Sequence, residues 1–369
     1  MKIALVANTD RYLLGYRIDL ARYLQASGHQ VTLISPPGKY SPGFSELGFE
    51  WKSLTLSRKG VNPIAELKSL LQLMRFYQQA NFDVVHHFTI KGVLYGSIAA
   101  KLAHIPKIVN SITGLGHIFT SKAFLISVVR FFVMILYRLF FQGTKVIFQN
   151  RDDMQFFVSR RLIDEGQVRL IEGSGVDVDR FVTTTEPQGT PRIILVSRLL
   201  WEKGVGEFVE AAAALKSRGH EIECVLVGDT DDGNPNAIPR NVINDWVQQK
   251  IVKWDGWIEN MPEVYAKSHI VCLPSYYGEG LPKTLIEAAA CGRPLVAADI
   301  SGSREIVQDG LNGFLVPAKN VVALADALEK LIVSPQLRLQ MGIFGRNLAE
   351  NRFSSAKIDK QTLAVYLEA

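Results

Sequence analysis

Short, apolar, strand-forming segments alternate with amphipathic helical stretches along almost the whole chain, and this pattern occurs twice. Six segments of the first half are typical of buried strands: 2–7, 30–35, 83–88, 107–112, 145–150 and 168–173. The pattern then starts again in four further segments: 192–197, 223–228, 270–275 and 294–299. Alternation of buried strands and helices indicates parallel sheets with helices on both faces. The sequence therefore predicts an α/β protein with two Rossmann-like lobes.

The length of the chain fits two lobes as well. Its 369 residues exceed the usual size of a single hydrophobic core. We predict an N-terminal domain over 1–182 and a C-terminal domain over 190–353, joined by a polar Thr/Gly/Pro segment at 183–191 that suits a linker. Open α/β sheets bind ligands outside the carboxyl ends of their strands. We therefore expect the lobes to face each other across a cleft, with functional residues directly after strands.

Charge is distributed unevenly along the chain. Residues 1–180 hold 22 Lys and Arg against 13 Asp and Glu, whereas residues 181–369 hold 19 against 23. The basic first half suggests an anionic partner, either a phosphorylated substrate or a membrane surface, and a merely solvated basic face is the alternative. Three cysteines in apolar surroundings, without CxxC spacing, indicate buried thiols in a reducing compartment. Since the N-terminus also lacks a signal-peptide core, we expect a cytoplasmic protein.

Residues 122–142 form an apolar stretch long enough to raise the question of a membrane span. Arg130 lies near its middle and Arg138 follows, and each costs about 2.5–3.5 kcal/mol at the centre of a bilayer. A spanning helix is therefore disfavoured. Together with Ser127 the two arginines form a narrow polar stripe, which fits a helix buried in its lobe or one lying in the membrane interface. We favour the buried helix.

Two glutamates, Glu279 and Glu287, stand eight positions apart around a Gly-Leu-Pro turn that follows a predicted strand. Pro282 suits the start of a helix, and backbone N–H groups from Gly280 to Leu285 would be unpaired there. Such a helix start attracts phosphate, and carboxylates accept hydrogen bonds from paired hydroxyls. We therefore expect a diphosphate at the helix start and a glutamate at each end of a bound nucleotide sugar. Exposed loop and helix charges are the alternative.

Arg198 and Lys203 follow the first strand of the second lobe, where two cations could neutralise a departing diphosphate without a metal ion. A surface pair at a helix start is the alternative. The acidic segment 229–235 looks like a metal-binding DxD motif, but acidic residues in a loop rich in Gly, Asn and Pro commonly serve turns, so we expect no metal. His86 and His87 end another predicted strand, where one fits the core and the other fits the cleft.

These residues resemble the donor site of the family 4 retaining glycosyltransferases, which are enzymes of the GT-B fold. The resemblance covers nearly the whole chain and is carried by the two glutamates, by Arg198 with Lys203, and by the segments "GSGVD" (173–177) and "GSREIVQDGLNGFLV" (302–316). Further segments look most like the branch that builds capsule, O-antigen or N-linked glycans on polyprenyl diphosphate: "TIKG" (89–92), "NSITGLG" (110–116) and "VIFQN" (146–150).

The resemblance implies a retaining, metal-independent transferase without a cofactor, which moves a hexose or N-acetylhexosamine from a UDP-sugar to a lipid-linked glycan. Its expected partners are the nucleotide sugar, the polyprenyl-diphosphate-linked acceptor and the inner face of the cell membrane, with no nucleic acid. By the same resemblance, residues 354–369 form a helix that crosses back to the first lobe. A GT-B-fold nucleotide-sugar epimerase and a non-catalytic nucleotide-sugar-binding protein are the alternatives.

The resemblance also assigns roles to single residues. Arg198 and Lys203 would bind the diphosphate, Glu279 the sugar hydroxyls and Glu287 the ribose. The complete set that it implies for the donor is Arg198, Lys203, Glu279, Gly280, Leu281, Pro282, Lys283, Thr284, Leu285 and Glu287. His117 would face the reacting sugar, with Thr113 as the residue that aligns best with the family histidine.

Overall fold

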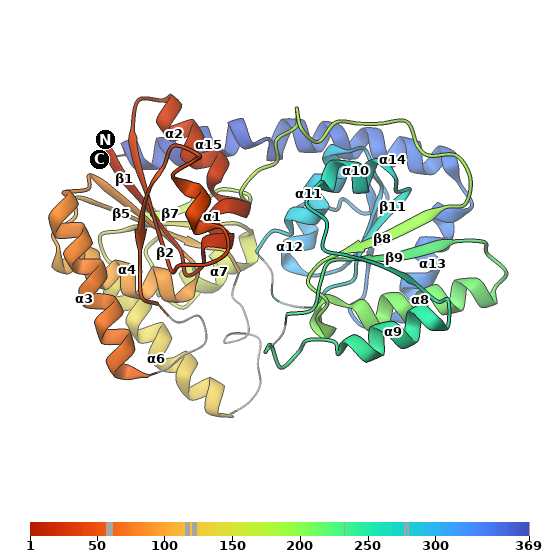
Figure 1. Cartoon of the computed structure of the whole chain (residues 1–369), viewed down its shortest axis with the longest axis horizontal. Coiled ribbons are helices and arrows are strands. Elements are labelled where there is room, and N and C mark those ends of the chain that lie inside the picture. Colours follow the sequence, from red (N-terminus) through yellow and green to blue (C-terminus); the bar gives the residue numbers. More distant parts are fainter. Residues whose placement is uncertain are drawn as a thin grey trace. The chain divides into compact units, whose positions relative to one another are not determined.

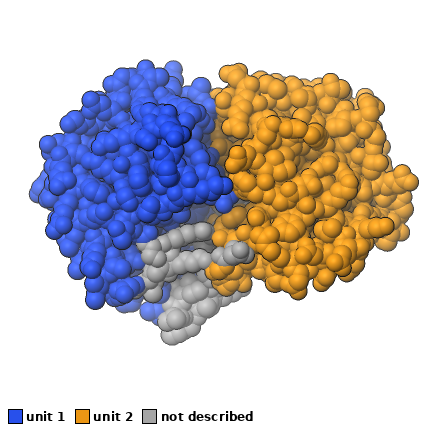
Figure 2. All heavy atoms as spheres, in the orientation of Figure 1, with its two compact units in different colours: residues 1–174, 355–369 blue, residues 175–354 orange. Residues whose placement is uncertain are grey.

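The computed structural model of the chain describes residues 1–56, 62–114, 119, 124–231, 233–276, 278 and 280–368. The chain divides into two compact units (Figure 2). Unit 1 contains residues 1–174 and 355–369, and unit 2 contains residues 175–354. Each unit carries one parallel sheet with helices packed on both faces (Figure 1). The predicted fold class, an α/β protein with two Rossmann-like lobes, is confirmed.

Unit 1 has a seven-stranded sheet in the order β3-β2-β1-β4-β5-β6-β7, and all neighbouring strands that pair are parallel. Its strands are β1 (Lys2–Val6), β2 (Gln30–Ser35), β3 (Glu50–Ser53), β4 (Val84–Phe88), β5 (Lys107–Ile112), β6 (Lys145–Phe148) and β7 (Val168–Leu170). Its helices are α1 (Asp10–Tyr16), α2 (Ile18–Ala26), η1 (Ser41–Phe44), α3 (Pro63–Ala80), α4 (Ile90–Leu102), α6 (Phe124–Phe140), α7 (Arg151–Ser159), η2 (Glu165–Gln167) and α15 (Ser355–Leu367).

Side chains of the central strand β1 alternate between the two faces of this sheet, as the pleat of a strand requires. Ile3 and Leu5 pack in the cluster that contains α2 and α15, whereas Ala4 and Val6 pack in the cluster that contains α3 and α4. All four side chains are fully buried. Helix α15, the last element of the chain, thus covers one face of the first sheet (Figure 1).

Unit 2 has a six-stranded parallel sheet in the order β10-β9-β8-β11-β12-β13. Its strands are β8 (Arg192–Val196), β9 (Glu223–Val227), β10 (Lys253–Gly256), β11 (Ile270–Leu273), β12 (Leu295–Ala298) and β13 (Gly313–Val316). Its helices are η3 (Trp201–Lys203), α8 (Val205–Ser217), α9 (Arg240–Gln248), α10 (Met261–Ala266), α11 (Lys283–Ala290), α12 (Ser301–Arg304), α13 (Val321–Ile332), α14 (Pro335–Leu348) and the π-helical turn η4 (Ala349–Phe353).

The boundary after unit 1 lies at Ser174, eight residues before the predicted end of the first domain at 182. The intervening residues pack on unit 2. The Val176 N–H donates to the Phe353 carbonyl at 2.8 Å, and the Phe181 ring lies 6.1 Å from the ring of Tyr265. Because these contacts begin directly after Ser174, the chain enters unit 2 earlier than its composition suggests.

The Thr/Gly/Pro segment at 183–191 belongs to unit 2 and is not a free linker. The Arg293 guanidinium donates to the Thr184 hydroxyl at 2.5 Å, and the Arg338 guanidinium donates to the Glu186 carboxylate at 2.9 Å. Both arginines are almost fully buried. The segment is therefore fastened to unit 2 by two internal cations, a contact that its loop-like composition hides.

Helix α6 is not buried in its unit, so the interpretation that we favour from the sequence is wrong. Val133 and Tyr137 pack inward with 8% and 1% exposure. Six large apolar side chains of the same helix are 39–60% exposed: Val128, Val129, Phe131, Phe132, Ile135 and Leu139. The unit thus covers one narrow stripe of α6 and leaves most of its apolar surface open. Within the described ranges, no helix combines the length and the apolar character that crossing a membrane requires.

Candidate active site

Three loops of unit 2 follow the carboxyl ends of β8, β9 and β11, and hydrogen bonds join them. The Leu199 N–H donates to the Asp229 carbonyl at 3.0 Å, and the Trp201 N–H donates to the Asn236 carbonyl at 3.0 Å, so the loop after β8 pairs with the loop after β9. The Tyr276 N–H donates to the Glu202 carbonyl at 3.0 Å and ties in the loop after β11. The segment with Arg198 and Lys203 is therefore held on both sides.

Gly204 allows a close approach between the loops after β8 and β11. Its φ of 74° lies in the left-handed region, and a Cβ built on it would lie 2.2 Å from the carbonyl oxygen of Pro274. Only a glycine fits both conditions. Lys203, the residue before it, is 9% exposed although its side chain is cationic. The tight contact between the loops after β8 and β11 thus holds a buried cation at the carboxyl ends of these strands.

Arg198 forms an ion pair with Asp231 in the loop after β9. Its Nη1 lies 2.7 Å from the Asp231 carboxylate, and the Asn234 side-chain amide donates to the same carboxylate oxygen at 3.2 Å. Asp229, at the start of the same acidic segment, pairs with Arg240 at 2.8 Å. These two acidic side chains are thus engaged with arginines. Within the described part of the chain, no group of three or more His, Cys, Asp or Glu side chains could hold a metal ion.

Helix α11 starts beside the end of β8. Pro282 is its N-cap residue, and the Thr284 hydroxyl donates to the carbonyl of Val196, the last residue of β8, at 3.2 Å. This bond places the start of α11 next to the loop with Arg198. The Leu285 N–H, which the sequence counts among unpaired donors, instead donates to the Pro282 carbonyl at 3.1 Å. The first turn of α11 tightens at this point, which removes Leu285 from the donors that could face a ligand.

Glu287 lies one turn into α11 with its side chain 12% exposed. The Tyr265 hydroxyl donates to Glu287 Oε2 at 3.0 Å, and Lys283 Nζ lies 3.9 Å from Oε1. Burial raises the pKa of Glu287, while Lys283, the Tyr265 hydrogen bond and Arg180 act in the opposite direction. The carboxylate is therefore a largely enclosed acceptor with one oxygen bonded to the protein.

The structure places most of the predicted donor residues at the carboxyl ends of two neighbouring strands in the unit 2 sheet. Arg198 and Lys203 follow β8, and the segment from Gly280 to Glu287 follows β11, the strand that pairs with β8. Leu281 and Leu285 point their side chains into the core. Glu279 and His117 lie outside the described residues.

Asp231 and Tyr265 are polar neighbours of this site that sequence reasoning missed. Asp231 carried a signal, because its acidic loop follows a strand next to β8, but the loop composition favoured a turn. Tyr265 carried none, because it lies on α10, the helix before β11, and nothing in the chain order indicates that its hydroxyl meets Glu287. Contacts between side chains of neighbouring helices depend on packing that periodicity does not encode.

The two histidines of β4 are both fully buried, so the prediction that one of them faces a cleft is wrong. His86 Nδ1 lies 2.5 Å from the Tyr366 hydroxyl, and its Nε2 lies 2.7 Å from the Ser111 hydroxyl. His87 bonds the Tyr77 hydroxyl at 2.9 Å and Asn110 Oδ1 at 2.8 Å. Burial lowers the pKa of His87 to about 4 and that of His86 well below its usual range. Both are neutral core residues, and each of their ring nitrogens has a hydrogen-bond partner.

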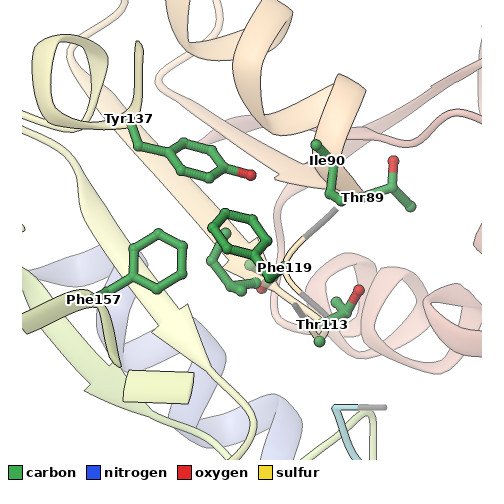
Figure 3. A pocket seen from close by; sticks show the side chains of 9 residues that line it. Thr89, Ile90, Thr113, Phe119, Tyr137 and Phe157 are labelled. Carbon is green, nitrogen blue, oxygen red and sulfur yellow. The ribbon is translucent and has the colours of Figure 1, made fainter. Parts of the chain in front are cut away.

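Thr113, the alternative to His117, lies just past the end of β5 and lines a small cavity of about 10 Å³ (Figure 3). Aromatic rings of Phe119, Tyr137 and Phe157 form much of its wall, and Figure 3 shows Thr89 at its side. Such a volume is enough for roughly one water molecule. The cavity as it stands is too small for a sugar.

Two family models match this chain. The model described as glycosyl transferases group 1 matches residues 179–348, and the model described as glycosyl transferase 4-like matches residues 2–150. Each model thus covers most of one lobe. Together they cover every strand of the two sheets except β7.

Two relatives that match most of this chain are sugar transferases. The N,N'-diacetylbacillosaminyl-diphospho-undecaprenol alpha-1,3-N-acetylgalactosaminyltransferase of Campylobacter jejuni is 28% identical over 96% of this chain and 94% of its own. The UDP-Gal:alpha-D-GlcNAc-diphosphoundecaprenol alpha-1,3-galactosyltransferase of Escherichia coli is 24% identical over 82% of this chain and 80% of its own.

Solved structures agree in fold. A glycosyltransferase from Rickettsia africae superposes with a TM-score of 0.81 at 22% identity, covering 99% of this chain and 97% of its own. Anabaena Alr3699/HepE in complex with UDP and glucose superposes with a TM-score of 0.81 at 19% identity, covering both chains completely. From its two matched lobes and its relatives, this chain belongs to the family 4 glycosyltransferases of the GT-B fold.

Proposed function

We propose that this glycosyltransferase moves a hexose or N-acetylhexosamine from a UDP-sugar to a glycan carried on polyprenyl diphosphate, with retention at the anomeric carbon and without a metal ion. The names of the Campylobacter jejuni and Escherichia coli relatives support the lipid-linked acceptor, and the second also supports a UDP-sugar. The complex of the Anabaena protein with UDP and glucose supports a uridine nucleotide.

The observation that carries the proposal is the arrangement of side chains at the carboxyl ends of β8 and β11 in unit 2. Two cations, Arg198 and Lys203, follow β8, and the Thr284–Val196 hydrogen bond fixes the start of α11 beside that strand. A helix N-terminus and two cations suit a diphosphate, and the enclosed carboxylate of Glu287 suits the ribose hydroxyls. Glu279 would then take the hydroxyls of the transferred sugar.

The reaction needs no protein nucleophile in this proposal. The bond between the anomeric carbon and the β-phosphate oxygen breaks while the acceptor hydroxyl oxygen bonds to the same face of that carbon. The hydroxyl proton passes to the departing diphosphate. Arg198 and Lys203 would stabilise the negative charge that grows on the diphosphate, an electrostatic contribution that is typically the largest in such transfers.

A panel of UDP-sugars, offered with a membrane extract as acceptor, tests the proposal by the release of UDP and by the sugar added to the lipid fraction. One UDP-sugar should support transfer. The Lys203→Ala variant should lose about 100-fold or more in kcat/KM, because a buried cation on the leaving group is removed. The control is Lys330→Ala, an exposed lysine of α13. Near-normal turnover by a folded Lys203→Ala variant would remove the site assignment.

The alternative of a nucleotide-sugar epimerase has no support in the matched family models or in the relatives described above. Incubation of the UDP-sugar without acceptor separates the two activities. An epimerase would convert the sugar under these conditions, whereas the transferase leaves its configuration unchanged.

We also propose that unit 1 binds the inner membrane surface through α6, where the lipid-linked acceptor lies. The exposed apolar residues of α6 include Phe131 and Phe132, at 58% and 60% exposure. The chain from residue 84 to residue 151 contains eight Lys and Arg and no acidic residue. Apolar side chains on a basic background are the combination that binds anionic lipid surfaces.

Co-sedimentation with vesicles of phosphatidylglycerol and phosphatidylcholine tests this docking. The wild-type chain should bind, and the double variant Phe131→Ser/Phe132→Ser should bind about 10-fold more weakly or worse, since two phenyl groups no longer enter the lipid. A matched control is Leu339→Ser/Ile343→Ser, which removes two exposed apolar side chains from α14 of unit 2. Equal binding by both double variants would refute the role of α6.

A further inference from the structure

Tyr265 is the only tyrosine of the described unit 2 residues whose hydroxyl bonds a carboxylate of the donor site. Its side chain is fully buried, and its ring packs 6.1 Å from Phe181. The hydroxyl lies 3.0 Å from Glu287 Oε2 and 3.3 Å from the Thr284 carbonyl oxygen. Burial raises the pKa of Tyr265 well above its usual value, so the hydroxyl keeps its proton and acts as a donor. A buried ring thus holds one fixed donor against Glu287.

The other oxygen of Glu287 is left for a ligand. Within the described residues its nearest cation is Lys283, whose Nζ lies 3.9 Å from Oε1, beyond hydrogen-bond distance. A carboxylate offers about four acceptor positions on its two oxygens. Tyr265 occupies one position on Oε2, and Oε1 retains its capacity to accept from a hydroxyl pair.

Holding the carboxylate in place has a direct effect on binding. A glutamate has three rotatable side-chain bonds, and ordering such a side chain on binding costs conformational entropy. Lys283, one turn away on the same helix, would attract a carboxylate that is free to rotate. Because the Tyr265 hydroxyl is fixed by its buried ring, it keeps Oε2 in one place before any ligand arrives.

On the basis of the proposed function, we infer that Tyr265 is a positioning residue that orients Glu287 toward the ribose diol and so sets the preference for ribonucleotides over 2′-deoxyribonucleotides. Glu287 would touch the nucleotide, whereas Tyr265 acts through it. The inference concerns the nucleotide end of the donor and leaves the transferred sugar to other residues.

Calorimetric titration of the full chain with UDP and with 2′-deoxy-UDP tests this inference. The wild-type protein should bind UDP more tightly than 2′-deoxy-UDP. Tyr265→Phe should weaken UDP binding about 10-fold and 2′-deoxy-UDP binding by less than about twofold, so that the preference for UDP is lost. In the Glu287→Gln background, Tyr265→Phe should have no further effect. In turnover, KM for the UDP-sugar should rise while kcat changes little, because the ribose is remote from the bond that breaks.

Tyr366→Phe is the matched control. Tyr366 is also a fully buried tyrosine with a bonded hydroxyl, but its partner is His86 in unit 1. It should leave both nucleotide affinities unchanged. Tyr265→Leu, which fills the site with another apolar side chain, is a second variant in case Tyr265→Phe does not fold, and it should lose the same preference.

The outcomes separate the inference from the proposed function. If Glu287→Gln weakens UDP but Tyr265→Phe binds both nucleotides like the wild type, or weakens both equally, the positioning role is wrong and the donor site stands. If Glu287→Gln binds UDP like the wild type while folded, the assignment of Glu287 to the ribose is wrong, and the inference about Tyr265 is overturned with it.

Discussion

In the proposed function Glu287 binds the ribose, and burying its carboxylate costs the fold stability. Its side chain is 12% exposed, and burial raises its pKa although the Tyr265 hydroxyl, Lys283 and Arg180 favour the ionised form. An unfolded chain would solvate the same carboxylate in water. A neutral residue of the same shape would avoid this cost, so a carboxylate at this position is better explained by binding than by stability.

The first prediction concerns the stability of Glu287→Gln. Because the pKa of Glu287 is higher in the folded than in the unfolded protein, the folded state binds more protons between the two values. The unfolding free energy of the wild type should therefore fall as pH rises from the unfolded to the folded pKa of Glu287, and change no further above it. Urea unfolding should show that Glu287→Gln is more stable than the wild type at pH 8, with a difference that shrinks toward pH 4. A variant less stable than the wild type at pH 8 would contradict the pKa shift.

At the scale of residues, the sequence predicts which side chains follow a strand better than it predicts which side chains contact them. Arg198 and Lys203 could be found because they follow a strand that hydropathy reveals. The contacts of Asp231 with Arg198 and of Tyr265 with Glu287 could not be predicted, because the partners are 33 and 22 positions apart in the chain. The prediction for His86 and His87 is right for the residue expected in the core and wrong for the one expected in a cleft. The alternation of side chains along a strand does not show that helices cover both faces of the sheet.

At the scale of elements, all ten strands expected from apolar runs are present, and the three that were missed lie at the edges of their sheets. These are β3, β10 and β13. Edge strands are covered by fewer neighbours, and β3 and β10 have only exposed and half-buried residues, so no continuous apolar run marks them. The prediction that α6 is buried is wrong for the opposite reason. This helix has more apolar residues than its unit covers.

The second prediction concerns the glycine between the loops of the donor site. Gly204→Ala should destabilise unit 2 by about 3 kcal/mol or more, since it adds a contact with the Pro274 carbonyl to the cost of a left-handed conformation. Transfer activity should fall as well, because Lys203 must move. The matched control is Gly219→Ala, whose φ is 89° but whose Cβ would meet nothing within 4 Å, and it should cost only about 1 kcal/mol. If urea unfolding showed equal losses of stability for Gly204→Ala and Gly219→Ala, the loops would be able to move apart and the close contact would not matter.

At the scale of the whole molecule, the division into units sharpens the charge difference seen along the chain. Unit 1 holds 23 Lys and Arg against 13 Asp and Glu, whereas unit 2 holds 18 against 23. The first unit is thus strongly basic and the second mildly acidic. In the proposed function the basic unit meets the anionic lipid and the acceptor, so vesicle binding should weaken as salt is raised.

The third prediction concerns the last helix. Residues 355–369 belong to unit 1, and Ile358, Val365 and Tyr366 of α15 pack in its core. A chain ending at Ser354 should lose about 5 kcal/mol or more of unit 1 stability, through exposed apolar surface and an unsatisfied His86. Calorimetry should show the transition of unit 1 lowered or lost, with that of unit 2 retained. Tyr366→Phe, which removes only one hydroxyl, should cost about 1–2 kcal/mol, and a truncated chain with both transitions unchanged would refute this role of α15.

The return of α15 to unit 1 also bears on how the protein is made. A ribosome delivers the chain from the N-terminus, so residues 1–174 emerge well before α15 and unit 2 can fold in the interval. The apolar side chains of the first sheet that α15 covers therefore remain open to water until α15 has been synthesised. The half of the enzyme that is synthesised first is the half that is finished last, and this interval is when a chaperone would find its binding surface.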